Sequence, residues 1–458
     1  MSEEIKQENK MGVMPVGKLV ITMSLPIMAS MLVQALYNIV DSVFVAKISE
    51  NALTAVSMAF PIQNLMIAVG TGTAVGVNAL LARNLGAKDF KRVNKIGENA
   101  VFLIFISYAL FLLIGLFGAE DFYRSQTDIE EIIVYGTQYL EICCCLSIGL
   151  FFQLFFERIL QATGKTVLSM ITQGFGAIIN LVLDPILIFG LFGFPKMGVS
   201  GAALATVIGQ IMAGILSIMI NEVANREVRI QMRGFRPDGQ IIRQIYEIGV
   251  PSIIMSSIGS VMTYGMNIIL MGFSATATAV FGVYFKLQSF VFMPLFGLNN
   301  GVIPIIAYNY GAGNRKRVLD TMKQSIYWAV GIMLVGCVIF EAVPEALLRM
   351  FEASETMLAI GVPALRIICI SYLFAGFCIA SGSIFQALGY ATYSMIVSLA
   401  RQLLVLLPLA YLFSLSGNVT LVWFSFPIAE LVSLALSAYY LVKLNKKVIS
   451  KIGESKSL

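Results

Sequence analysis

Twelve long apolar segments, separated by short polar ones, constrain this chain more than any other feature of its sequence. Each is about 20 residues or longer, the length at which an α-helix crosses a bilayer, whereas strands of a membrane barrel need only about 9–11. Charged residues make up 12% of the chain, about half of the proportion that is typical of soluble proteins. We therefore predict an all-α polytopic membrane protein with twelve transmembrane helices. The segments are 19–45, 52–80, 97–117, 132–156, 166–190, 200–221, 247–271, 276–306, 325–343, 357–384, 391–413 and 420–442.

The basic residues predict the orientation of these helices, because cytoplasmic loops of membrane proteins are enriched in Lys and Arg. With the N-terminus inside, the inside segments hold 24 of the 31 Lys and Arg residues and the outside loops hold 4. The outside loops at 120–131 and 341–355 are acidic, which agrees with this orientation. We expect a multi-pass protein in a lipid bilayer, with both termini in the cytoplasm.

The second half of the chain repeats the first at a constant offset. NLGAKDFKRV at 84–93 matches NYGAGNRKRV at 309–318 in six of ten positions, and QATGKTVLSMI at 161–171 matches QALGYATYSMI at 386–396 in six of eleven. Parallel repeats of this kind are typical of transporters with a cavity between the two halves. We predict two pseudosymmetric six-helix lobes around a central cavity, joined by a cytoplasmic linker that acts as a hinge. The N-terminal lobe is predicted at 19–221, the linker at 222–246 and the C-terminal lobe at 247–443. Cytoplasmic tails are predicted at 1–18 and 444–458.

Two acidic residues lie inside predicted membrane helices, Asp41 in the first and Asp184 in the fifth. A carboxylate at this depth costs about 2.5–3.5 kcal/mol on insertion scales, so it needs a proton, a metal cation or a basic side chain as its partner. Asn180 precedes Asp184 by one helical turn, and Pro185 follows it, which predicts a bend beside the acid. We favour an ion or proton site, and a structural acid permanently paired with Lys or Arg is the alternative.

The first predicted helix carries a stripe of polar residues that includes Asp41. Gln34, Asn38 and Asp41 have i, i+4 and i+7 spacing, which places them on one helical face, and Tyr37 lies beside them. We predict that Gln34, Tyr37 and Asn38 line a substrate cavity. Lys286, in the eighth predicted helix, faces the same cavity if the two halves are symmetric, and it is then a candidate partner for an acid of the first half.

The predicted membrane depths bring four polar residues together. Thr206 lies about two turns into the sixth helix from its outside end, at a depth similar to those of Asp41 and Asp184. Carboxylate, amide and hydroxyl oxygens are ligands for hard cations. We therefore predict that Asp41, Asn180, Asp184 and Thr206 form a coupling site for a shared proton or for Na⁺, with the first three as the Na⁺ ligands. The alternative is that these groups only bond neighbouring helices.

The acids are not repeated with the helices, because Asp41 corresponds to Met266 and Asp184 to Leu409 at the offset of the repeat. Ion chemistry is therefore predicted in the N-terminal half alone. In the C-terminal half, Arg366, Arg401 and Glu430 are interpreted as a structural ion cluster. Glu157 and Arg158, at a predicted helix end, are interpreted as solvated.

The chain contains no histidine, which removes His-based zinc sites, His-dependent triads and His proton relays. It also shows no metal-ligand spacing and no nucleophile–base pair. The net charge of +5 is located in loops and does not indicate a nucleic-acid partner. We expect a protein that is not an enzyme and that uses no cofactor besides H⁺ or Na⁺ as a coupling ion.

Six sequence motifs resemble the multidrug and toxic compound extrusion (MATE) family, in particular its DinF/MepA-like bacterial branch. The motifs are LPIM at 25–28, VDSVFV at 40–45, NLGAKD at 84–89, QATGK at 161–165, LDPILIFG at 183–190 and GVSGAALAT at 198–206. The resemblance implies a transporter in the bacterial cytoplasmic membrane. It also implies that Asp41 and Asp184, with Asn180, are the coupling residues. Other branches carry an acid in the seventh helix, and the core of 247–271 has none here.

The function that we expect is a cation-coupled antiporter that functions as a monomer and exports amphiphilic, mostly cationic organic compounds or drugs by alternating access. The alternative within the same superfamily is a flippase for a lipid-linked saccharide, which needs basic side chains in its cavity to bind pyrophosphate. Pro26 lies about four turns before Asp41 and is the predicted bending point of the first helix.

Overall fold

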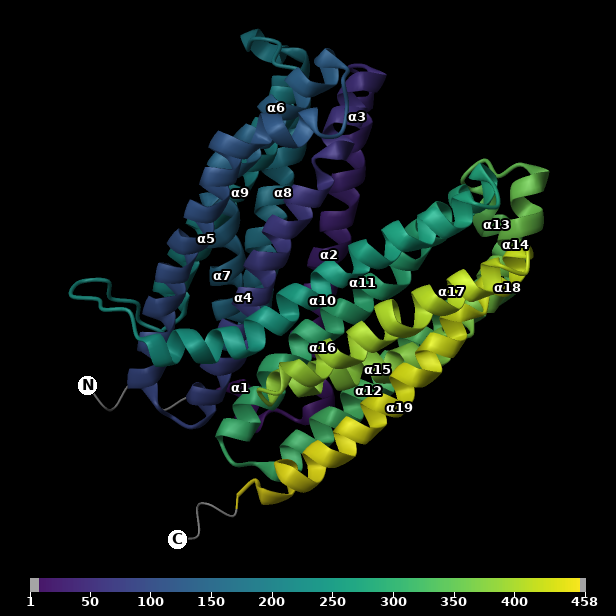
Figure 1. Ribbon diagram of the computed structural model, residues 1–458. Coiled ribbons are helices and arrows are strands. Elements are labelled where there is room, and N and C mark those ends of the chain that lie inside the picture. Colours follow the sequence, from purple (N-terminus) through teal and green to yellow (C-terminus); the bar gives the residue numbers. More distant parts are fainter. Residues whose placement is uncertain (1–7, 454–458) are drawn as a thin grey trace. The chain divides into compact units, whose positions relative to one another are not determined.

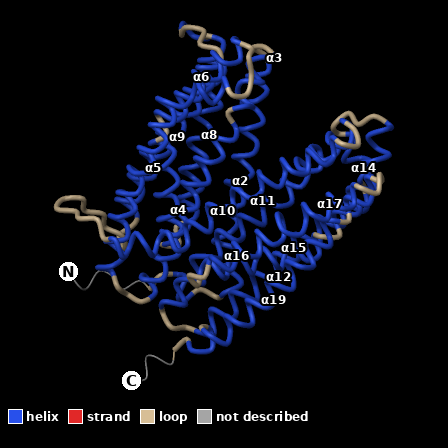
Figure 2. The backbone as a smooth tube through the Cα atoms, in the orientation of Figure 1, coloured by secondary structure: helices blue, strands red, loops and turns tan. Residues whose placement is uncertain are grey.

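The computed structural model describes residues 8–453, which fold almost entirely into helices and contain no strand (Figures 1 and 2). Ten of the helical segments are long and apolar enough to cross a membrane, and two bent helix pairs bring the number of possible crossings to twelve. The predicted all-α class and the predicted number of membrane segments are therefore confirmed. The predicted tails extend into residues 1–7 and 454–458, which lie outside the described residues.

The helices are longer than the apolar segments that predicted them. The third segment is predicted at 97–117, whereas α5 runs over Phe90–Arg124. The helix begins where the Asp89 side chain accepts a hydrogen bond from the Arg92 N–H, as a capping residue does. Apolar periodicity marks only the lipid-embedded part of such a helix, and the capping residues determine where it ends.

The first half of the chain forms helices α1–α9. Their bounds are α1 (Lys10–Val13), α2 (Val16–Ala46), α3 (Glu50–Met58), α4 (Phe60–Gly86), α5 (Phe90–Arg124), α6 (Glu130–Cys145), α7 (Ile148–Ala162), α8 (Thr166–Phe189), a 3₁₀ turn η1 (Leu191–Gly193) and α9 (Val199–Ala224). The pair α6 and α7 is bent by 46° at its junction.

The second half repeats this order. It comprises α10 (Gly239–Met271), α11 (Ala275–Gly311), α12 (Arg315–Ala342), α13 (Pro344–Arg349), α14 (Glu355–Cys369), α15 (Tyr372–Ala387), α16 (Ala391–Leu399), a π-helical segment η2 (Ala400–Leu406), α17 (Leu407–Ser414), α18 (Val419–Trp423), α19 (Ser425–Lys447) and η3 (Ile449–Lys451). Its bent pair, α14 and α15, turns by 50°.

The sequence repeat is a structural repeat. The starts of α5, α6 and α8 are separated from those of α12, α14 and α16 by the offset that joins Asn84 to Asn309 in the sequence, and the ends of α8 and α17 have the same separation. The span that is one regular helix in the first half, Thr166–Phe189, is therefore divided in the second half by the π-helical turns of η2.

The chain divides into two compact units that exchange the beginnings of two helices. The N-unit comprises Ala29–Gly249, and the C-unit combines the segment up to Met28 with the segment from Val250 onward. Helix α2 passes from one unit to the other just after Pro26, and α10 does so just before Pro251. Both helices continue through their proline. That the chain is organised into lobes at 19–221 and 247–443 stays a prediction.

The repeated motif at 84–93 and 309–318 holds these exchanged segments within each unit. In the C-unit, the Arg317 guanidinium donates to the carbonyl oxygens of Met11 and Met14, at 2.9 and 2.8 Å. In the N-unit, the equivalent Arg92 donates to the Gln244 side chain at 2.7 Å. Arg317 thus fixes the chain that leads into α2, and Arg92 contacts the beginning of α10.

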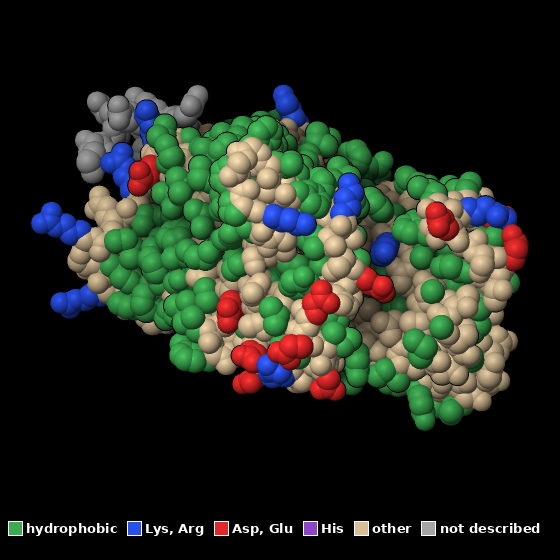
Figure 3. Space-filling model, turned by 90° about the horizontal axis from the view of Figure 1, so that it is seen from above, with side chains coloured by type: hydrophobic (Ala, Val, Ile, Leu, Met, Phe, Trp, Pro, Cys, Tyr) green, Lys and Arg blue, Asp and Glu red, His purple; other side chains and the backbone are tan. Residues whose placement is uncertain are grey.

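Figure 3 shows a largely hydrophobic surface on which acidic side chains gather in small groups. One group of exposed acids in the N-unit lies between the end of α5 and the start of α6. There Arg124 forms ion pairs with Glu120 at 2.8 Å and with Glu130 at 3.3 Å. The orientation is predicted from the distribution of Lys and Arg, these acids agree with it, and it stays a prediction.

Candidate functional site

Helix α2 supplies the first side of the candidate site. Its residues Leu36, Ile39 and Val43 are half-exposed or more, as expected of a face that meets lipid. Tyr37 and Asp41 lie on another face of the same helix and are only partly exposed. The partly exposed polar residues Gln34, Tyr37 and Asp41 have i, i+3 and i+7 spacing, which places them on one helical face.

Helix α8 supplies the second side through one stripe of polar residues. Gln173, Asn180 and Asp184 share a helical face because they are spaced by seven and four residues. The Gln173 side chain donates to the Gln34 Oε1 of α2 at 2.9 Å. Gln34 lies seven residues before Asp41 and Gln173 lies eleven residues before Asp184, so this hydrogen bond joins the two helices two to three turns away from the acids.

Helix α9 approaches α8 closely enough to complete the site. A Cβ atom added at Gly209 would lie 2.7 Å from the Gly176 carbonyl oxygen and 3.3 Å from the Asn180 Cβ, so only glycine permits this crossing. The Asn180 side chain consequently reaches across and donates to the Thr206 hydroxyl at 3.2 Å. It also lies 3.5 Å from Asp184 Oδ1, at the outer limit of a hydrogen bond.

The carboxyl groups of Asp41 and Asp184 lie close enough to interact with each other. Asp184 is fully buried, and no described residue forms a salt bridge with either acid. Two carboxylates accept hydrogen bonds but donate none, and two buried like charges repel, so this proximity favours a proton or a cation shared by the pair. The four residues predicted to converge, Asp41, Asn180, Asp184 and Thr206, are therefore brought together.

Three oxygen atoms of this group are buried without a hydrogen-bond partner among the described residues: Asp41 Oδ1, Asn180 Oδ1 and Asp184 Oδ2. A buried acceptor that lacks a donor costs about 1–3 kcal/mol, and more if it is charged. One cation satisfies several such oxygens at once, and carboxylate and amide oxygens are the donors that Na⁺ and other hard cations take. The donor set thus fits either Na⁺ or a shared proton.

Helices α4 and α6 carry polar side chains toward the same acid. The Gln63 amide donates to the Tyr139 hydroxyl at 3.1 Å and lies 3.8 Å from the Cys143 sulfur. Tyr139 and Cys143 are both near enough to Asp41 to interact with its charge. These residues were not predicted from the sequence, because a single tyrosine or glutamine in an apolar helix gives no periodic signal.

Glu157 of α7 is a third buried acid of the N-unit, and its interpretation as a solvated residue was wrong. Its side chain is 6% exposed and accepts hydrogen bonds from Gln153 at 3.0 Å and from Thr172 at 3.3 Å. Tyr37 lies near enough to interact with its charge. The predicted segment ended at residue 156, whereas α7 continues to Ala162, so Glu157 lies inside the helix.

The remaining predicted residues are Asn38, Lys286 and the two prolines. Asn38 is exposed on α2, and Lys286 is exposed on α11 of the C-unit. Pro26 and Pro185 both lie inside continuous helices, α2 and α8. A cavity role for Asn38 and Lys286, and bending at the prolines, stay predictions.

The charges of the C-unit form separate pairs, so the predicted cluster of three was wrong. Arg401 Nη1 lies 3.1 Å from Glu430 Oε2, and the Glu430 side chain is only 5% exposed. Arg366 lies 3.9 Å from Glu341, and both side chains are more than half exposed. Arg366 lies on α14, which places it with the acid at the end of α12 and not with η2 and α19. No group of three or more Cys, Asp or Glu residues suited to a metal occurs among the described residues.

Comparison with known proteins gives a family match over most of the chain. The MatE family model matches residues 26–186 and 251–412, once in each half. The multidrug export protein MepA of Staphylococcus haemolyticus is 27% identical over 428 residues, which cover 93% of this chain and 93% of that protein.

Solved structures show the same fold. The outward-facing conformation of a multidrug resistance MATE family transporter of the MOP superfamily superposes with a TM-score of 0.88 at 23% identity, covering 97% of this chain and 100% of that one. A MOP superfamily transporter from Pyrococcus furiosus gives a TM-score of 0.87 at 23% identity, covering 97% and 99%. The reverse polarity of its binding pocket suggests a different function for that protein.

Proposed function

Because the chain belongs to the MatE family of membrane transporters, we propose that it is a cation-coupled antiporter that exports amphiphilic, mostly cationic organic compounds by alternating access. Membership of this family agrees with the prediction that the protein is a multi-pass membrane transporter and not an enzyme. The names of relatives such as the multidrug export protein MepA support small organic molecules as the substrates.

The pair formed by Asp41 and Asp184 is the observation that carries the proposal. Its two carboxyl groups and the Asn180 Oδ1 need a cation or a proton, and no described side chain supplies a positive charge to them. A cation or proton from solution can supply this positive charge only while the site is open to the solution. If the ion binds more tightly in one state of the transporter than in the other, its gradient shifts the population of states and drives export.

Helix α2 gives a route by which ion binding changes the structure. With both acids charged and no cation present, repulsion pushes α2 away from α8, and a proton or Na⁺ removes that repulsion. Pro26 cannot complete the helical hydrogen bond one turn earlier, so α2 has a point at which it bends at low cost. We propose that neutralisation of the pair lets α2 bend at Pro26 and expel the substrate.

The predicted alternative, a flippase for a lipid-linked saccharide, is less well supported. Binding of pyrophosphate needs basic side chains without an acidic partner. Arg401 pairs with Glu430, and Arg366 pairs with Glu341. Lys286 is the remaining basic side chain that was predicted from the sequence to lie at membrane depth.

Efflux from proteoliposomes tests the proposal. The purified protein is reconstituted into liposomes loaded with a fluorescent organic cation, and Na⁺ and pH gradients are imposed separately. Directed proton or sodium entry is expected to accelerate efflux of the dye, while a lipid-linked saccharide is not moved. Efflux that ignores both gradients contradicts ion coupling, and transport of the lipid-linked saccharide alone supports the flippase.

A further inference from the structure

A polar cavity of about 530 Å³ lies where the linker between α9 and α10 folds back on α5. The linker is the long loop that joins these two helices in Figures 1 and 2. The residues that carry the argument are Lys95 and Asn99 of α5 and Arg233, Phe235, Arg236 and Asp238 of the linker. All of them belong to the N-unit.

Specific contacts hold the linker against α5. The Asp238 N–H donates to Asn99 Oδ1 at 3.0 Å, and the Phe235 ring lies 5.8 Å from the Phe102 ring. A Cβ atom added at Gly97 would meet the Ile230 side chain at 3.0 Å, so the loop packs tightly on this helix. The cavity is therefore a built feature of the fold, with one wall on a membrane helix.

The charge of the cavity favours an anion. Lys95, Arg233 and Arg236 are exposed and form no ion pair with any described residue. Of the two acids in the wall, Asp238 already accepts hydrogen bonds from the Gln240 and Ile241 N–H groups at the start of α10. The wall thus carries three basic against two acidic side chains, and the hydrogen bonds that Asp238 accepts turn one of its oxygens toward the backbone of α10.

The position of the cavity along α5 favours a ligand with an apolar part. Phe105 and Ile106 are each 48% exposed and begin the lipid-facing surface of α5. They follow Asn99 by six and seven residues, which corresponds to about 10 Å of helix. A ligand in the cavity thus has its charged group beside Lys95 and an apolar surface next to it in the direction of the bilayer core.

We propose that this cavity binds the phosphate-bearing headgroup of an anionic phospholipid. Arginine suits phosphate because its guanidinium donates several hydrogen bonds in one plane. Basic pockets at the ends of membrane helices on the cytoplasmic side are suited to such headgroups, and the linker is predicted to lie on that side. This assignment does not depend on the proposed transport function.

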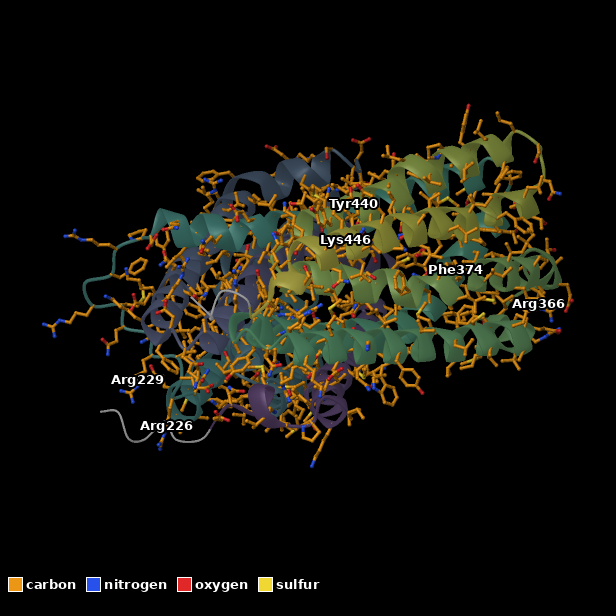
Figure 4. The ribbon with its side chains drawn as sticks, turned by 90° about the horizontal axis from the view of Figure 1, so that it is seen from below. Arg226, Arg229, Arg366, Phe374, Tyr440 and Lys446 are labelled. Carbon is orange, nitrogen blue, oxygen red and sulfur yellow. The ribbon has the colours of Figure 1, made fainter. Side chains whose placement is uncertain are left out.

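The test compares two variants that remove equal charge from the same linker. Arg233→Gln/Arg236→Gln removes two side chains of the cavity wall, and Arg226→Gln/Arg229→Gln is the matched control. Figure 4 shows Arg226 and Arg229 at the edge of the molecule, and neither lines the cavity. The hydrogen bond that holds this part of the loop uses the Arg229 backbone N–H, so the control keeps it.

Each full-length protein is equilibrated with mixed micelles of phosphatidylglycerol and phosphatidylcholine, and the bound lipid is counted by native mass spectrometry. The wild type is expected to retain phosphatidylglycerol preferentially. The cavity variant should bind it about tenfold more weakly than the control variant does, because charge-assisted contacts are lost as well as general attraction. Circular dichroism verifies that both variants are folded.

Two results would overturn the proposal. An equal loss of phosphatidylglycerol binding in both double variants would show that the linker attracts anionic lipid only through its overall charge. Displacement of phosphatidylglycerol by inorganic phosphate at the same concentration would show that the cavity recognises free phosphate, with no contribution from the lipid.

Discussion

The crossing of α8 with α9 and the equivalent crossing of η2 with α19 use opposite means to pack two membrane helices. In the N-unit, Gly176 and Ala205 are small, and the helices approach until backbone meets backbone. At the corresponding positions of the repeat, the C-unit has Arg401 and Glu430, whose side chains form an ion pair of 3.1 Å. Equivalent crossings are thus held by close backbone packing in one unit and by charge pairing in the other.

The difference extends to the acids of the coupling site. Asp41 corresponds to Met266, which is fully buried, and Asp184 corresponds to Leu409. The C-unit therefore supplies the positive charge for Glu430 from its own sequence, while in the proposed mechanism the N-unit takes that charge from solution. A permanent pair stabilises a fold, whereas a pair of acids that depends on an external ion makes the fold respond to that ion.

The largest effect is expected from removing one acid of the N-unit. Asp41→Asn or Asp184→Asn should abolish drug resistance in a host that expresses the protein, because a neutral amide removes one of the two carboxyl groups that share the coupling ion. Expression and thermal stability should be retained, since the amide is similar in size and carries no charge to desolvate. Growth in the presence of an organic cation, with immunoblotting for expression, measures this, and full resistance in both variants would contradict the site.

Removing the acid of the C-unit should act on stability instead. Glu430→Gln leaves the Arg401 guanidinium without its partner, and breaking a buried pair costs about 3–5 kcal/mol, with the lower end expected because Arg401 is 24% exposed. Thermal unfolding of the purified protein measures the loss. The double variant Arg401→Met/Glu430→Met should recover most of it. An unchanged melting temperature in the single variant would show that the pair is not structural.

A methyl group at the N-unit crossing should have a smaller effect. Gly209→Ala places a Cβ atom 2.7 Å from the Gly176 carbonyl oxygen, and overpacking of this kind costs about 1–3 kcal/mol. Gly174→Ala on α8 is the matched control, because nothing lies within 4 Å of the added atom. The melting temperature of Gly209→Ala should therefore be lower than that of Gly174→Ala. Equal melting temperatures would show that the close approach of α8 and α9 does not position Asn180.

The smallest effect is expected at Thr206. Thr206→Val keeps the shape of the side chain but removes the acceptor that holds the Asn180 amide at 3.2 Å. The lost hydrogen bond should weaken ion binding by about 1 kcal/mol. Half-maximal efflux should then need a roughly fivefold higher concentration of the coupling ion. Thr206→Ser retains the hydroxyl group and should behave like the wild type. If serine and valine have the same effect, the hydroxyl does not contribute.

Much of the fold was predictable because membrane helices are encoded by simple patterns. The apolar segments, the constant offset between the repeated motifs and the family motifs led to the helical architecture and its internal repeat. Asp41 and Asp184 were identifiable because a lone acid in an apolar helix is costly wherever it packs. Helix ends were less accurate, since α7 continues through Glu157 to Ala162.

Pairing between helices was the part that the sequence did not reveal. Gln173 lies on the same face of α8 as Asp184, and only packing shows that it bonds Gln34. The pairing of Arg366 with Glu341 likewise depends on which helices are neighbours. The exchange of helix beginnings between the units rests on contacts such as Arg317 with the Met11 carbonyl oxygen, for which no sequence pattern exists.

Counting the cations that a substrate displaces tests most directly whether ion coupling resides in the N-unit alone. An organic cation is added to the purified protein, and released protons are measured in weakly buffered solution while displaced sodium is measured with radioactive Na⁺. We expect about one coupling cation per chain from the wild type, because two adjacent carboxyl groups share a single charge-balancing ion. Glu430→Gln should release the same amount and Asp184→Asn none. Unchanged release from Asp184→Asn, or its loss in folded Glu430→Gln, would contradict this account.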